Sequence, residues 1–167
     1  MAITRLNNNS ASSITSLSGL TSLPSGLVGD NTPAFKAQVS SNRGPFSANT
    51  WTDIPFGTEQ FDTNNAFNGT TFTIPETGKY LFTVQLRVEQ LATNLYYQVK
   101  IDGASQSSVA TIATAGFDET TSYFPLGFSV ILNQNQNDNL KVQLFQGGNA
   151  TSYVHTESWF GACKLIT

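Results

Sequence analysis

The sequence predicts an all-β fold, a sandwich or barrel of about eight to ten short strands. Three observations lead to this prediction. From Pro33 onward apolar and polar residues alternate with period two, turn signals recur at short intervals, and no segment has the apolar periodicity of a long helix. All 12 Phe, 5 Tyr and 2 Trp residues lie in this part of the chain, which is long enough to bury a sizeable core.

The first strand candidates end at residues that favour turns. Residues 34–39 and 51–56 alternate in polarity, and the second run contains a proline near its end. Phe67 and residues 72–74 flank Asn68-Gly69, a dipeptide typical of tight hairpin turns. We therefore expect two short strands followed by a hairpin.

The longest strand candidate covers residues 79–88 and follows a turn at residues 75–78. Successive side chains of a strand point to opposite faces, so every second residue should face the core. The residues expected to share the buried face are Tyr80, Phe82, Val84, Leu86 and Val88.

The second half of the domain continues the same pattern. Residues 96–101 form a strand that meets the turn signal Asp102-Gly103, and the adjacent Tyr96 and Tyr97 should point to opposite faces. The remaining strand candidates are residues 124–132, 140–145, 152–155 and 158–166, separated by a polar loop at 133–139 and a turn at 147–149.

Residues 1–32 differ in composition and are predicted to form an extended arm ahead of a domain at residues 33–167. Residues 1–34 contain no aromatic side chain and only two charges, and Ser, Thr and Gly, which are poor helix formers, separate the apolar residues. A disordered tail and an arm that docks on a partner both fit this pattern. The docking candidates are Ile14, Leu17, Leu20, Leu23 and Leu27.

The composition excludes several classes of protein. Charged residues make up only 11% of the chain, whereas Ser, Thr, Asn and Gln account for 63 of the 167 residues. A net charge of −3 argues against a nucleic-acid partner, because few phosphates could be neutralised. One Cys and one His exclude an internal disulfide and a Cys/His zinc site. No apolar run approaches the length of a transmembrane helix, so we expect no membrane partner.

Residue types that carry catalysis are sparse. His155 is the only histidine, and no Gly-x-Ser-x-Gly motif indicates a serine nucleophile. Cys163 lies among apolar neighbours in the last strand, as a small core residue does. The only oxygen-rich clusters are Asp118-Glu119 and the loop at 133–139, and the loop fits a polar turn better than a calcium site. We expect no enzyme activity, no cofactor and no metal, and assign no catalytic residue.

Three spaced motifs stand out in the domain, with a short strand ahead of them. They are Phe72-x5-Gly78-x-Tyr80-x-Phe82, Leu132 through Asp138 to Leu140-x-Val142-x-Leu144, and Ser158-Trp159-Phe160-Gly161-Ala162, preceded by Pro33-Ala34-Phe35. In this order the motifs resemble those of the C1q/TNF-like domain family, and the resemblance covers residues 33–167. The sequence departs from the family at Val84, where an aromatic residue is usual, and Phe61 and Phe67 match its upstream aromatic spacing only loosely.

The resemblance implies a C1q/TNF-like jelly-roll β-sandwich of ten strands that assembles as a compact homotrimer and mediates binding. Few charges and many aromatic residues are compatible with both a two-sheet core and a buried contact between subunits. The candidates for core or trimer packing are Phe35, Tyr80, Phe82, Leu144, Trp159 and Phe160.

The opening Met1-Ala2-Ile3-Thr4-Arg5-Leu6-Asn7-Asn8-Asn9-Ser10 resembles the start of marine bacteriophage structural proteins. It lacks the apolar segment of a secretory signal, so either the chain folds in a cytoplasm or a signal has been removed. Met1 favours the first alternative, and we expect synthesis in a host cytoplasm. The resemblance implies a non-enzymatic decoration or cement protein on a capsid surface, held through the arm to the major capsid protein or another virion protein. The alternative is a receptor- or glycan-binding head of a tail fibre or appendage. A hydrolase on a jelly roll is least favoured.

Overall fold

The computed structural model describes residues 32–90, 95–103, 110–115, 122–148 and 152–165. The chain divides into Met1–Asp30 and Asn31–Thr167, and the described residues belong to the second unit. The five docking candidates from Ile14 to Leu27 lie outside the described residues, so the division at residues 32 and 33 and the role of the arm stay predictions.

The described residues form strands and turns only, as predicted. Among them there is no helix with the length and apolar character needed to span a membrane. The strands are β1 (Ala34–Gln38), β2 (Trp51–Asp53), β3 (Thr58–Asp62), β4 (Thr71–Thr73), β5 (Gly78–Gln90), β6 (Tyr96–Gly103), β7 (Ala110–Ala115), β8 (Ser122–Gln134), β9 (Asn139–Gly147), β10 (Ser152–Val154) and β11 (Trp159–Lys164).

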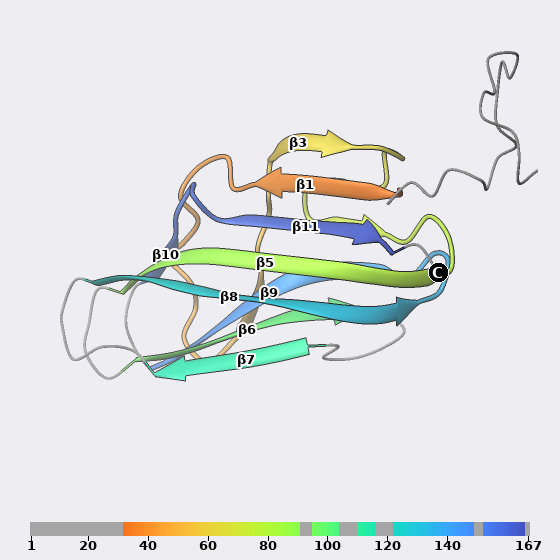
Figure 1. Ribbon diagram of the computed structural model, residues 1–167. Coiled ribbons are helices and arrows are strands. Elements are labelled where there is room, and N and C mark those ends of the chain that lie inside the picture. Colours follow the sequence, from red (N-terminus) through yellow and green to blue (C-terminus); the bar gives the residue numbers. More distant parts are fainter. Residues whose placement is uncertain (1–31, 91–94, 104–109, 116–121, 149–151, 166–167) are drawn as a thin grey trace, which may run out of the picture. The chain divides into compact units, whose positions relative to one another are not determined.

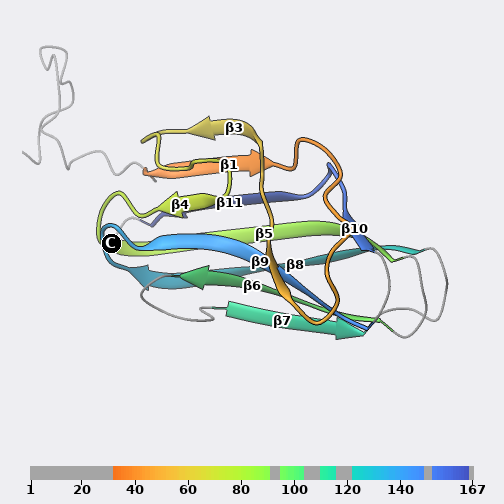
Figure 2. The same cartoon turned by 180° about the vertical axis from the view of Figure 1, so that it is seen from behind.

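The strands pair in two antiparallel sheets. Sheet A has the order β3-β1-β11-β5-β8, with β10 beside β5 beyond the start of β11 (Figure 1). Sheet B has β9 between β6 and the short strands β2 and β4, and β7 lies beyond β6 (Figure 2). Most partners are distant in the sequence, so the chain crosses repeatedly between the sheets, as in a jelly roll.

The structure has more strands than the eight to ten predicted, because two positions in the sheets are each shared by two short strands. Strands β10 and β11 pair with consecutive stretches of β5, and β2 and β4 pair with consecutive stretches of β9. Between β10 and β11 the chain leaves the ladder at residues 155–158, although the His155 amide still donates to the Arg87 carbonyl oxygen at 2.9 Å. Each pair therefore occupies a single position in its sheet.

The core lies between the two sheets and confirms the alternation predicted for residues 79–88. Their inward side chains, from Tyr80 to Val88, are each at most 1% exposed. Aromatic rings fill the region around Phe35, which stacks on Phe67 and Phe72 at centroid distances of 4.8 and 4.3 Å. Burial of these large rings supplies much of the hydrophobic stabilisation of the fold.

Several boundaries differ from the sequence prediction. Strand β2 ends at Asp53 instead of residue 56. Pro55 has no amide hydrogen to continue the ladder, and the chain then crosses to sheet A with Ile54 and Phe56 buried. Strand β8 continues to Gln134, which shortens the polar loop predicted at 133–139. Strands β3 and β7 were not predicted. Both are edge strands. Strand β3 is almost wholly exposed, so it lacks the apolar alternation of a half-buried strand, and β7 has a weakly apolar sequence of alanine, threonine and one isoleucine.

Candidate functional site

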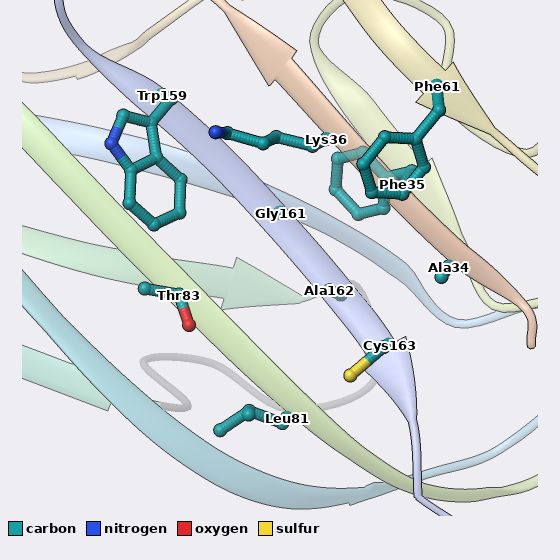
Figure 3. A pocket seen from close by; sticks show the side chains of 10 residues that line it. All are labelled: Ala34, Phe35, Lys36, Phe61, Leu81, Thr83, Trp159, Gly161, Ala162 and Cys163. Atoms are coloured by element: carbon teal, nitrogen blue, oxygen red, sulfur yellow. The ribbon is translucent and has the colours of Figure 1, made fainter. Parts of the chain in front are cut away.

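The outward face of sheet A carries a shallow apolar trough of about 190 Å³, called the sheet A trough below. Strands β1, β3, β5 and β11 form it side by side (Figure 3). The lining residues are Ala34, Phe35, Lys36, Phe61, Leu81, Thr83, Trp159, Gly161, Ala162 and Cys163. An outward sheet face in contact with water would favour polar side chains, so this lining points to a covered surface.

The rim of the trough is built by long side chains around a floor of small ones. Trp159 is half-buried, and the Lys36 ammonium lies 4.8 Å from the centroid of its ring. Phe61 extends from β3 with 49% of its surface exposed. Gly161 has no side chain at the middle of β11, which leaves the floor open between Phe61 and Trp159 (Figure 3).

A second apolar surface lies along β8, at the edge of sheet A. Ile131 is 58% exposed and pairs with Leu81 of the trough. On the other side of the strand, Phe128, Val130 and Leu132 are only partly buried against the core. Ile131 therefore lies on the outward face beside the trough, whereas the other three side chains form an apolar margin at the β8 edge.

A polar cluster occupies the far end of the same face. The carboxylate of Glu89 contacts Nε2 of His155 at 3.0 Å and accepts a hydrogen bond from the Tyr123 hydroxyl at 2.8 Å. The Arg87 guanidinium lies 4.5 Å from the centroid of the Tyr123 ring and pairs with Glu157 at 2.5 Å. The contacts with His155 and Tyr123 lower the pKa of Glu89, and the bond to Glu89 raises the pKa of Tyr123.

The structure separates the six packing candidates into two groups. Five are core residues that are at most 1% exposed, namely Phe35, Tyr80, Phe82, Leu144 and Phe160. Trp159 instead points outward and lines the trough. Among the six, Trp159 is therefore the side chain placed to contact another molecule.

Comparisons with known proteins extend this picture at the level of the fold. No protein-family model matches the sequence, and no curated protein is similar to it. Among solved structures, the globular domain of zebrafish complement 1qA protein has a TM-score of 0.57 at 16% identity, covering 80% of this chain and 97% of that chain. Murine APRIL at pH 8.0 has a TM-score of 0.58 at 13% identity, covering 79% and 98%. The fold is a C1q/TNF-like jelly roll.

Each described residue that was considered for catalysis or metal binding has contacts within the jelly-roll domain. His155 contacts Glu89. Cys163 is half-buried and lines the trough on the outward face, so the prediction of a core residue was wrong. Asp138 is 6% exposed, and its carboxylate accepts a hydrogen bond from the Asn135 amide, which makes a polar turn. In the described part of the chain no group of three or more His, Cys, Asp or Glu could hold a metal ion. Asp118-Glu119 lies outside the described residues.

Sequence reasoning missed the outward residues of the C1q/TNF-like domain that form the apolar surface, chiefly Phe61, Leu81 and Ile131. A signal was present for two of them. Leu81 lies between Tyr80 and Phe82, and Ile131 lies between Val130 and Leu132, so both interrupt the alternation of apolar and polar residues. A continuous apolar run in a strand indicates that both of its faces are covered.

The polar cluster predicts a pH dependence of stability. Because folding lowers the pKa of Glu89 below its ordinary value of 4.5, the cluster stabilises the fold at neutral pH and loses this contribution as the pH falls through the lowered pKa. Glu89→Gln should therefore lower Tm at pH 7 by more than it does at pH 3. Thermal unfolding at both values checks this, with Glu59→Gln on the exposed strand β3 as the control. An equal change in Tm at both values would contradict it.

Proposed function

We propose that this chain is a non-enzymatic binding and assembly module that works as a homotrimer. The observation that carries the proposal is the apolar outward face of sheet A, with Phe61, Trp159 and Leu81 in the trough and Ile131 beside it. A contiguous apolar patch on a protein surface marks an interaction site. The C1q/TNF-like fold supports a second copy of the same chain as the partner.

The position of the two apolar surfaces supports a closed ring. The sheet A trough spans β1, β3, β5 and β11, whereas the second surface follows the β8 edge of the same sheet. When two different patches of one subunit fit each other, subunits associate head to tail, and a suitable rotation closes the ring. A trimer formed in this way covers both patches on every subunit and leaves the outward face of sheet B accessible.

The trimer would act on the surface of a virion. The resemblance of the first ten residues to phage structural proteins and the leucines of residues 1–32 support attachment to a capsid through the arm. Ordering an arm costs about 1–2 kcal/mol per residue in backbone entropy, which the apolar side chains must offset on the shell. A receptor- or glycan-binding head is the second candidate, favoured by exposed aromatic side chains on sheet B such as Tyr96.

Deleting residues 1–30 tests assembly and attachment together. By light scattering, the full chain and the shortened chain should both have about three times their own chain mass, because the proposed contact lies within the domain. On capsids that lack the wild-type protein, the full chain should bind and the shortened chain should not.

The two readouts separate three parts of the proposal, namely the trimer, the arm and the virion role. Monomeric mass for both proteins would rule out the trimer. Undiminished capsid binding by the shortened chain would rule out the arm, and no capsid binding by the full chain would rule out the virion role while leaving the trimer intact.

A further inference from the structure

Three aromatic side chains form a continuous strip on the outward face of sheet B, called the aromatic strip below. Phe145 of β9 lies between Trp51 of β2 and Tyr96 of β6, with ring centroids 5.4 and 5.8 Å away. The rings are tilted by 51° and 36° relative to Phe145, so each neighbouring ring presents both an edge and part of a face. Tyr96 is 45% exposed, and the other two are half-buried.

The outer rings of the strip are held in position from beneath. Gly147 pairs with Tyr96, and a Cβ atom at Gly147 would lie 1.9 Å from Cε1 of the tyrosine ring. The ring therefore lies against the backbone of β9, in space that any larger residue would fill. At the other end, the ammonium of Lys100 lies 4.5 Å from the centroid of Trp51, and its side chain is only 11% exposed. The Trp51 ring thus covers this lysine.

The margin of the strip is polar and electrically balanced. Asp53 accepts hydrogen bonds from Lys141 at 2.9 Å and Gln143 at 2.6 Å, and Lys100 pairs with Asp102 at 3.0 Å. Burial opposes ionisation of Asp53, but the bonds from Gln143 and Lys141 outweigh it and lower its pKa. Two lysines and two aspartates therefore cancel, and this face favours a neutral ligand with hydrogen-bonding groups.

The accessible area is too small for a stable protein interface. An aromatic side chain buries about 150–250 Å² when fully covered, and Tyr96 is the most exposed of the three at 45%. The strip therefore offers at most about half of the roughly 800 Å² per partner that a standard protein interface buries. An area of this size suits a short stretch of a small ligand.

We propose that the aromatic strip binds a neutral saccharide. The rings would lie against the C–H faces of successive pyranose units, and the amide of Gln143 and the carboxylate of Asp53 would meet the hydroxyl groups at the edge. Rigid aromatic side chains provide such contacts at a low cost in conformational entropy, and a few polar groups fix the orientation. The inference rests on the proposed binding role but not on the trimer, because one subunit supplies the whole strip.

Titration of the full chain with neutral oligosaccharides tests the proposal. The probes are maltohexaose, cellohexaose, chitohexaose and mannohexaose, and the readout is tryptophan fluorescence, which Trp51 supplies within the strip. At least one sugar should cause a saturable change. Tyr96→Ala should weaken its binding by at least tenfold, and Gly147→Ala should weaken it through displacement of the Tyr96 ring. Tyr123→Ala, which removes a comparably exposed ring from sheet A, should leave the affinity unchanged.

Several outcomes would overturn the saccharide site. They are no response to any of the four sugars up to millimolar concentrations, an affinity that Tyr96→Ala does not change, or binding of the anionic sugar polygalacturonate in preference to all neutral ones. Far-ultraviolet circular dichroism on each variant confirms that the sheets are intact. Light scattering on the same samples keeps the two proposals apart, because a monomer that binds sugar contradicts only the trimer, and a trimer without sugar binding contradicts only the strip.

Discussion

Replacing Leu81 by aspartate is expected to convert the protein from a trimer into a monomer. Leu81 lines the sheet A trough between Cys163 and Ile131 on the neighbouring strands, so the new carboxylate would be buried among apolar side chains at the proposed contact. Burying a charge in an apolar contact costs several kcal/mol. In a closed trimer this cost arises at each of the contacts between subunits. The mass from light scattering should fall from three chains to one at micromolar concentrations.

A matched variant on the other sheet distinguishes loss of assembly from loss of folding. Gln98 is half-buried on the outward face of sheet B, as Leu81 is on sheet A, and both lie on inner strands. Gln98→Asp should therefore keep the trimer mass. A Leu81→Asp protein that remains trimeric with intact circular dichroism would mean that the trough is not the contact.

Replacing Phe160 by alanine is expected to cost about 3–5 kcal/mol of the free energy of unfolding, as for other fully buried Phe residues. Phe160 is 0% exposed and meets the ring of Phe35 edge-on at a centroid distance of 5.0 Å. It also contacts the rings of Phe82 and Phe56, so its removal opens a cavity that rigid aromatic neighbours cannot fill.

Urea unfolding at a single protein concentration measures this loss, because the stability of an oligomer varies with concentration. Tyr96→Ala is the control. It removes a ring of similar size that is 45% exposed, and it should cost about 1 kcal/mol or less. Similar losses for the two variants would mean that the ring packing around Phe160 does not dominate the core.

The sequence predicted the parts of the fold that depend on burial. The alternation from Tyr80 to Val88 identifies the inward face of β5, because one buried face imposes period two on any strand. A strand with mostly exposed or weakly apolar side chains lacks this pattern. Strand β3 presents mostly exposed side chains, so no apolar pattern indicates a strand there. Strand β7 has the weakly apolar sequence Ala-Thr-Ile-Ala-Thr-Ala, which is built of small residues and one isoleucine.

The candidate sites were harder to predict, because they depend on register across strands that are distant in the sequence. Leu81 can be assigned to the outward face only because its neighbours Tyr80 and Phe82 face inward. Its position beside Ile131 follows from the pairing of β5 with β8. The aromatic strip likewise needs Trp51 and Tyr96 on either side of Phe145, although they are far apart along the chain. The sequence did predict that Tyr96 and Tyr97 face opposite ways, and Tyr97 is buried while Tyr96 is exposed.

The place of β11 in sheet A has a consequence for synthesis of the protein. This strand lies between β1 and β5, with Ala37 and Val84 on either side of Phe160, yet it is synthesised after every other described strand of the domain. Until then β1 and the Tyr80–Gln85 stretch of β5 have no partner on the sides that face each other, although β10 already pairs with the end of β5, and the core lacks the ring of Phe160. The domain therefore completes its fold only after residues 159–164 are translated. Until then its unpaired strand edges can pair with other chains, which low concentration or chaperones prevent.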